Sequence, residues 1–278
     1  MTNYHLSQRY DSPHGEARFG TSGKGPAVVL CHGTPTSSLI WHDVIPALEA
    51  DFTCYFLDLP GYGKSAKFEG QDLRLRALAQ TINGFCRHLG VKQPHLVGHD
   101  FGAAAVLGAH LVEGLEARSL TIADGVVLSP WGTPYSRLVK GHEAVFAAVP
   151  SYIHGAVLAA HLRTAMFLSP SSELLDSLVE PWTGETGQKA YYRNIGQFDY
   201  DYTTQLEKLY PGISIPTTVI WGEEDRWVDI SEGERFAALI PGARFQSLPR
   251  AGHFSMLDTP APFAEKLKAA LMTAEGRP

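Results

Sequence analysis

Short apolar runs alternate along the chain with longer stretches in which apolar residues recur at helical spacing. This alternation is typical of a parallel β-sheet that is covered by helices on both faces. Helices are expected over residues 73–88, which stop before Gly90, and over residues 103–111. Six strands are expected, over residues 27–31, 52–57, 95–97, 119–123, 217–221 and 243–248. The pattern therefore predicts an α/β fold with a mostly parallel, doubly wound sheet.

The pattern changes over residues 129–211. No run there is as strand-like as those in the rest of the chain, while aromatic residues accumulate. Because the segment lies between two expected strands, it would fold over the strand ends, and long insertions in a compact domain usually cover a functional site. We therefore expect a helical cap over 129–211 between two parts of one core, 1–128 and 212–278.

The composition places the chain among globular proteins. Its 278 residues are 44% hydrophobic and 19% charged, and a chain of this length can bury a large core without disulfides. The cysteines Cys31, Cys54 and Cys86 show no C-x-x-C spacing, which favours a reducing compartment. His154 and His161 are seven residues apart, but the sequence offers no third ligand for a metal. We expect a cytoplasmic protein that needs no cofactor or metal.

Charge and hydropathy limit the partners. The formal net charge is −6, and the basic residues are scattered rather than clustered, which argues against nucleic acid. The N-terminus lacks a cationic head followed by an apolar stretch, and no run of about 18 apolar residues occurs, so neither an export signal nor a membrane span is expected. A small apolar organic molecule is the expected partner. The chain is expected to be a monomer or a homodimer.

The motif GHDFG at residues 98–102 places Asp100 between an expected strand and an expected helix. Its form, small-x-nucleophile-x-small, is that of a strained turn that exposes the central side chain. The alternative interpretation is a helix N-cap between two glycines, because Asp is a favoured cap. Asp225 follows a later strand end and His253 lies near the C-terminus, so the chain order is nucleophile, acid, histidine.

This order and its strand–turn–helix context resemble the α/β-hydrolase fold from about residue 20 to residue 271. An elbow built on Asp, together with the HGTP loop at 32–35, resembles the branch that holds epoxide hydrolases and haloalkane or haloacid dehalogenases. His32 is expected to support that loop. The resemblance implies Asp100 as nucleophile, His253 as base, Asp225 as the acid that orients it, and the backbone amides of Thr34 and Phe101 as an oxyanion hole.

Three other residues are candidates for the acid that orients His253. Asp124 follows the strand after the elbow helix, where some dehalogenases of this family place their acid, and Glu223 and Glu224 precede Asp225. We prefer Asp225 because its strand-end loop matches the more common family position. Asp124 is equally well explained as a cap at the end of its strand.

A carboxylate nucleophile suits attack on a saturated carbon. With a reference pKa of about 3.9, Asp100 is ionised at pH 7 without a base, and its attack gives an alkyl ester. A water activated by His253 then cleaves the ester, and the two amides stabilise the oxyanion. Attack on an acyl carbon would instead give a high-energy anhydride, which disfavours an esterase.

The leaving group distinguishes the two best hypotheses. A halide needs donors such as indole N–H groups, and Phe101 stands where haloalkane dehalogenases usually carry Trp. Residues 33–41 nevertheless resemble the corresponding dehalogenase stretch, and Trp131 offers an indole from the cap. The apolar pocket is expected between Phe101, Trp41 and the cap.

An epoxide generates an alkoxide, which needs an acidic O–H donor such as tyrosine. Tyr192 begins a YRN segment that resembles the late cap of epoxide hydrolases, and Tyr152 is the candidate first donor. Epoxide hydrolysis is therefore the first hypothesis and hydrolytic dehalogenation the second. An esterase, a cofactor-free oxygenase or lyase, and a ligand-binding relative without turnover are further alternatives, because fold alone does not decide function.

Overall fold

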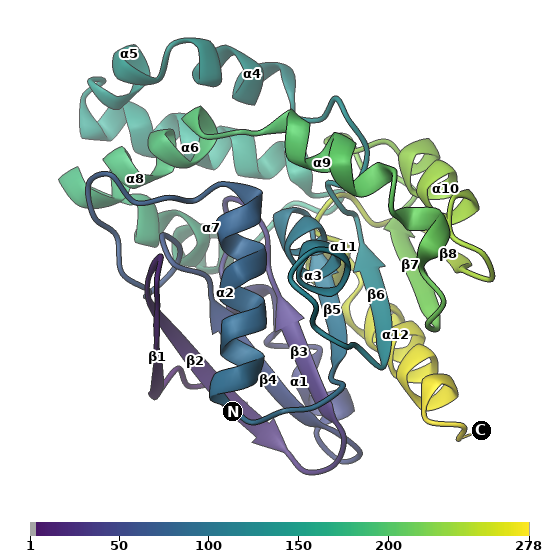
Figure 1. Ribbon diagram of the computed structural model, residues 1–278. Helices are drawn as coiled ribbons and strands as arrows, with labels where there is room; N and C mark the ends of the chain where they lie inside the picture. The colour runs from purple at the N-terminus through teal and green to yellow at the C-terminus, as the bar shows by residue number, and fades with distance from the viewer. Residues whose placement is uncertain (1–3, 278) are drawn as a thin grey trace.

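The computed structural model describes residues 4–277, and its centre is an eight-stranded sheet in the order β1-β2-β4-β3-β5-β6-β7-β8 (Figure 1). From β4 to β8 every neighbouring pair is parallel, whereas β2 is antiparallel to both β1 and β4. The strands are β1 (Gln8–Ser12), β2 (Gly15–Gly23), β3 (Ala27–Cys31), β4 (Thr53–Asp58), β5 (His95–His99), β6 (Ser119–Ala123), β7 (Thr217–Gly222) and β8 (Arg244–Leu248). The predicted α/β class and mostly parallel sheet are confirmed.

The six expected strands all exist, with ends shifted by two residues at most. The sequence analysis missed β1 and β2. β1 reads QRYDS, and most of its side chains are exposed, so it lacks the apolar run by which the central strands were found. An edge strand of this kind is defined by its pairing with a neighbour and not by its own hydrophobicity.

Helices cover both faces of the sheet, which explains why the central strands are continuous apolar runs. Figure 1 shows α2 and α3 in front of the sheet and α1 and α12 behind it. The helices that flank the sheet are α1 (Ile45–Leu48), α2 (Leu75–His88), α3 (Phe101–Leu111), α10 (Ile230–Ala238), α11 (Ser255–Asp258) and α12 (Pro260–Ala274).

A second group of helices lies between β6 and β7 and covers one end of the sheet (Figure 1). We name these six the cap helices. They are α4 (Pro134–Gly141), α5 (Glu143–Ala147), α6 (Ser151–Ala165), α7 (Ser172–Val179), α8 (Gly184–Gly196) and α9 (Tyr200–Glu207). Short 3₁₀ turns occur at η1 (Ser38–Trp41), η2 (Glu180–Trp182) and η3 (Tyr210–Gly212). The division into core and cap at residues 128 and 211 stays a prediction.

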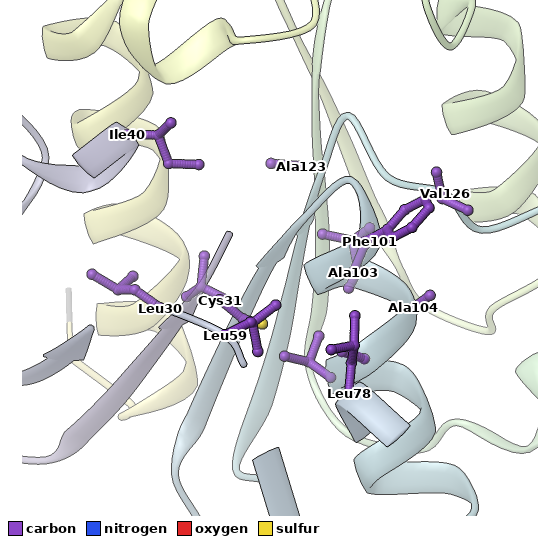
Figure 2. Packing of buried hydrophobic residues seen from close by; sticks show 14 of the residues in the cluster. Leu30, Cys31, Ile40, Leu59, Leu78, Phe101, Ala103, Ala104, Ala123 and Val126 are labelled. Carbon is purple, nitrogen blue, oxygen red and sulfur yellow. The ribbon is translucent and has the colours of Figure 1, made fainter. Parts of the chain in front are cut away.

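Helix α3 is buried on all sides from Phe101 to Ala109, so it has no polar face. It packs against α2, against the strands β3, β5 and β6, and against α9 of the cap. Figure 2 shows Ala103 and Ala104 on this helix, with Leu78 of α2 nearby. The small residues let α3 approach the sheet closely: a Cβ at Gly102 would lie 2.3 Å from the carbonyl oxygen of Cys31.

Gly102→Ala should therefore destabilise the protein. The added methyl group has backbone atoms as its nearest neighbours, which cannot rotate away, so we expect the free energy of unfolding to fall by about 1–3 kcal/mol. Gly155→Ala in α6 is the matched control, because a Cβ there meets no atom within 4 Å, and it should stabilise by about 0.5–1 kcal/mol. Urea unfolding measures both. Equal effects of the two substitutions would contradict this account of α3 packing.

Candidate active site

Asp100 lies at the turn between β5 and α3 with φ 50° and ψ −118°, a backbone conformation that non-glycine residues rarely adopt. Within residues 4–277, its side chain makes no capping hydrogen bond to α3. The geometry is therefore that of a strained strand-to-helix turn and not that of an ordinary N-cap. Gly98 is required at this turn because a Cβ there would lie 2.5 Å from the carbonyl oxygen of Gly102.

Two groups contact the carboxylate of Asp100. The backbone N–H of Thr34 donates to Oδ2 at 2.7 Å, and Nε2 of His253 lies 3.5 Å from Oδ1. The HGTP loop reaches the turn because Gly33 has no side chain: a Cβ there would lie 2.4 Å from the Asp100 side chain. His32 supports this loop as expected, since its Nε2 accepts from the N–H of Leu59 at 2.9 Å.

His253 and Asp225 form the second half of the site. Nδ1 of His253 donates to Oδ2 of Asp225 at 2.9 Å, and both side chains are buried. The other oxygen of Asp225 accepts from the backbone N–H groups of Trp227 at 2.8 Å and Val228 at 3.0 Å. Asp225 is thus fixed on both oxygens, and it holds the His253 ring with Nε2 toward Asp100.

The charge around His253 sets its protonation state. Burial lowers its pKa, but the negative charges and hydrogen bonds of Asp225 and Asp100 outweigh this and raise it to about 10. The imidazole is therefore protonated at neutral pH. Any loss of charge at Asp100 removes part of this stabilisation and lowers the pKa again.

Asp124, the alternative acid, has a different set of partners. Its Oδ1 accepts from the N–H of Gly222 at 2.7 Å, and its Oδ2 accepts from the hydroxyl of Ser255. Burial, and then the charge of Asp225, raise its pKa well above the usual value. The geometry therefore places Asp225 against His253, while Asp124 joins the end of β7 to the start of α11. Glu223 and Glu224 are exposed.

A cavity of about 440 Å³, a volume that includes space open to solvent, lies beside Asp100 and His253 and is lined in part by residues of the cap helices. Phe101, Trp131 and Phe198 form one wall, with ring centroids 4.7–5.1 Å apart. Tyr191 and the stacked rings of His161 and Trp227 line it as well. Apart from Asp100 and His253, the described lining contains no group that is charged at pH 7, because burial and then the charge of His253 lower the pKa of His161 to about 4.

The hydrogen-bond donors of the cavity differ in their availability. The indole N–H of Trp131 donates to Thr203 at 3.0 Å, and that of Trp227 donates to Thr164 at 2.9 Å. The hydroxyl of Tyr191 is buried and lies beside the hydroxyl of Tyr135, with which it interacts. Burial raises the pKa of Tyr191 well above its usual value, so the phenol stays protonated. Among the described residues that line the cavity, Tyr191 is the tyrosine.

Three of the predicted site residues lie elsewhere. Tyr152 is 75% exposed and does not line the cavity, so the prediction that it faces the nucleophile is wrong. Trp41 is buried in the core against Phe263 and not at the cavity. Tyr192 is buried, but its hydroxyl is engaged with Nδ1 of His154 at 2.9 Å, and it is absent from the described lining.

Sequence reasoning missed Tyr191 and His161. Neighbouring residues of a helix point about 100° apart, so Tyr191 and Tyr192 of α8 face different directions. The YRN resemblance located the segment but not the helix face. His161 was weighed with His154 as a metal pair, whereas Nε2 of His154 is hydrogen-bonded to the carbonyl oxygen of Trp182 at 3.0 Å.

Residues 4–277 contain no cluster of three or more His, Cys, Asp or Glu side chains arranged to hold a metal ion. Over the same range, no helix has the length and apolar character needed to cross a membrane. The triad and the cavity above it are therefore the features from which a function can be argued.

Comparisons with known proteins agree with this fold. A family model described as alpha/beta hydrolase fold matches residues 26–260. The crystal structure of an alpha/beta hydrolase fold protein from Burkholderia ambifaria superposes with a TM-score of 0.91 and 33% identity, over 97% of this chain and 98% of that chain. Haloalkane dehalogenase 2 of Mycobacterium tuberculosis is 25% identical over 97% of this chain and 95% of its own length.

A third relative is named for different chemistry. It is a 2-hydroxy-6-oxononadienedioate/2-hydroxy-6-oxononatrienedioate hydrolase of Comamonas testosteroni, 24% identical over 84% of this chain and 83% of its own length. The relatives thus differ in the substrates that their names state. With the family model covering most of its length, this chain belongs to the alpha/beta hydrolase fold family and is a hydrolase of that fold.

Proposed function

We propose that the protein hydrolyses epoxides to diols through an ester formed on Asp100. One observation carries the choice of substrate: the phenol of Tyr191 lines the cavity, while the indole N–H groups of Trp131 and Trp227 are already donated to threonines. An alkoxide leaving group needs a proton, which a phenol supplies, whereas a halide needs only free hydrogen-bond donors. The hydrogen-bond donors of the cavity therefore favour an epoxide over a haloalkane as the substrate.

Ring opening is the first step. An oxygen of Asp100 attacks a carbon of the epoxide, and the carbon–oxygen bond breaks with its electron pair moving to the ring oxygen. The hydroxyl of Tyr191 gives its proton to that oxygen. The product is a hydroxyalkyl ester on Asp100 and a tyrosinate at Tyr191.

Formation of the ester itself generates the base for the second step. In the free protein the charge of Asp100 helps to raise the pKa of His253 to about 10. The ester has no charge, so the pKa of His253 falls and the imidazolium loses its proton, which restores the phenol of Tyr191. Neutral His253 then takes a proton from water as the water attacks the ester carbonyl.

Two backbone amides stabilise the oxyanion that results. The N–H of Thr34 already donates to the carboxylate of Asp100 at 2.7 Å. Phe101 is the first residue of α3, where backbone N–H groups lack intrahelical partners and the helix dipole favours negative charge. When the tetrahedral intermediate collapses, its C–O bond to the substrate carbon chain breaks and the hydroxyl derived from water gives its proton to the departing alkoxide oxygen. The diol leaves, and the carboxylate of Asp100 is regenerated beside protonated His253.

Hydrolytic dehalogenation is the second candidate, supported by the 25% identity to a haloalkane dehalogenase over nearly the whole chain. It uses the same attack by Asp100 and the same hydrolysis by His253. The two reactions differ in the ester that they leave: an epoxide gives a hydroxyalkyl ester and a halide a plain alkyl ester.

His253→Gln should trap the ester, because glutamine cannot deprotonate water. After incubation with styrene oxide, mass spectrometry of the peptide that contains Asp100 should show the added mass of the intact epoxide. Asp100→Asn is the control and should show no addition.

Three other outcomes are informative. A trapped alkyl ester from a haloalkane, with none from epoxides, would establish the dehalogenase instead. Product formation without any ester would argue against covalent catalysis. Ligand binding without ester or product would indicate a relative that does not turn over its ligand.

The dependence of the His253 pKa on Asp100 can be measured without a substrate. In the wild type, NMR titration of the His253 ring should give a pKa near 10, because two carboxylates face it. In Asp100→Asn, which mimics the uncharged ester, that pKa should be lower by about 1–3 pH units. An unchanged pKa in this variant would contradict the proposed generation of the base by ester formation.

A further inference from the structure

His99 is a buried histidine beside the nucleophile that the mechanism above does not use. It is the last residue of β5, directly before Asp100, and its side chain is fully buried. Its Nε2–H donates to the backbone carbonyl oxygen of His253 at 2.9 Å, although 154 positions separate the two residues in the chain. One side-chain hydrogen bond therefore joins the turn that carries the nucleophile to the loop that carries the base.

We propose that His99 is a positioning residue, whose Nε2–H fixes the backbone of His253 so that the imidazole lies between Asp100 and Asp225. His99 is absent from the described lining of the cavity, so it acts through His253 and not on the substrate. The kinetic part of this inference rests on the proposed function, while a second measurement below needs no substrate.

The protonation state of His99 suits a donor to a carbonyl group. Burial and then the charge of His253 lower the pKa of His99 well below its usual value, so the ring is neutral at pH 7 and carries one N–H. A carbonyl oxygen can only accept, so this N–H is at Nε2. Nδ1 is buried and has no hydrogen-bond partner among residues 4–277. The bond to His253 is therefore the one that satisfies this buried ring.

The position of His253 matters because its ring works at both nitrogens. Nδ1 donates to Asp225 at 2.9 Å, and Nε2 lies 3.5 Å from Oδ1 of Asp100. The bond to Asp225 fixes one nitrogen but not the backbone from which the ring projects. The loop before His253 is anchored at Gly252, whose N–H donates to Asp258 at 2.9 Å. The carbonyl group of His253 itself is anchored by His99.

The ring of His99 also packs against the same loop. Its centroid lies 4.9 Å from that of His253 and 5.8 Å from that of Phe254, with the planes tilted. His99 therefore offers two separable contributions, a hydrogen bond to the backbone and the packing of a ring. Phenylalanine at this position keeps a ring and loses the N–H, whereas glutamine keeps an N–H and loses the ring.

The kinetic test separates the two chemical steps. In single-turnover reactions with styrene oxide, mass spectrometry follows the formation and the hydrolysis of the ester on Asp100. In His99→Phe, ester hydrolysis should slow by about 10–100-fold, the usual effect of a small misplacement of a catalytic group. Ester formation uses Asp100 and Tyr191, so it should change less than about threefold. His99→Gln should recover most of the lost rate of hydrolysis.

His95→Phe is the matched control for the loss of a buried histidine from the same strand. His95 begins β5 and is fully buried, and its ring nitrogens are bonded to Ser119 at 2.7 Å and Glu275 at 3.1 Å. It is absent from the described lining of the cavity. This substitution should lower the free energy of unfolding and leave the rates of both chemical steps close to those of the wild type.

Titration of the His253 ring by NMR tests the same inference without a substrate. The titratable groups whose charges interact with His253 are Asp100, Asp124, Asp225, His99 and His161. His99 is neutral at pH 7, so replacing it removes no charge, and a change in the pKa of His253 reports movement of the imidazole. In His99→Phe this pKa should fall from about 10 by about 1 pH unit, because the ring moves away from its carboxylates. In His99→Gln it should return toward the wild-type value.

The wild type provides a further measurement if His99→Phe does not fold, as judged by circular dichroism. The ring ¹⁵N shifts of His99 should then show a neutral imidazole protonated at Nε2, with a proton that exchanges slowly with water. A ring protonated at Nδ1 would overturn the proposed hydrogen bond.

Four other results would overturn the assignment. They are unchanged ester hydrolysis in His99→Phe, an equal loss in both steps, an unchanged pKa of His253, and a His99→Gln variant as impaired as His99→Phe. The last would show that the packed ring matters and not the N–H. A wild-type protein that forms no ester with any epoxide would overturn the proposed function alone, because the titration of His253 still decides the role of His99.

Discussion

The backbone of Asp100 carries the constraint on which the site depends. Its positive φ directs the carboxylate away from the amides of α3, where an ordinary N-terminal Asp would cap the helix. Such a conformation costs about 1–3 kcal/mol and persists only where surrounding structure determines it. Here β5 is paired on both edges and α3 is buried from Phe101 to Ala109, so neither end of the turn can relax. The strain is the physical reason that a charged oxygen faces a cavity.

The position of this turn in the sheet gives the carboxylate its partners. Chain order reverses where β3 lies between β4 and β5, and in open α/β sheets such a point forms a crevice at the strand ends. The loop after β3 therefore brings the N–H of Thr34 to Asp100, and the close approach needs Gly33 and Gly102 to lack side chains. The hydrogen bond from the Thr34 N–H to the Asp100 carboxylate is thus a consequence of strand order as much as of the two residues themselves.

The cap and the histidine loop are held by shared contacts. The carboxylate of Asp258 accepts from the backbone N–H groups of Phe167 and Leu168, which follow α6, and from that of Gly252, which precedes His253, each at 2.9 Å. The cap segment and the segment that carries the base are therefore positioned together.

The amino-acid sequence by itself determined the parallel core, the Asp100 turn and the chain order of Asp225 and His253, because apolar runs, glycines and turn residues act over a few neighbouring positions. It did not reveal β1 and β2. These segments lack a continuous apolar run, and they form strands because they pair with neighbouring strands. Only the tertiary structure decided which cap side chains reach the cavity. That choice depends on the rotation of each helix about its axis: a step of one residue turns the side chain by about 100°, so it separates Tyr191 from Tyr192 although both occupy the same short segment.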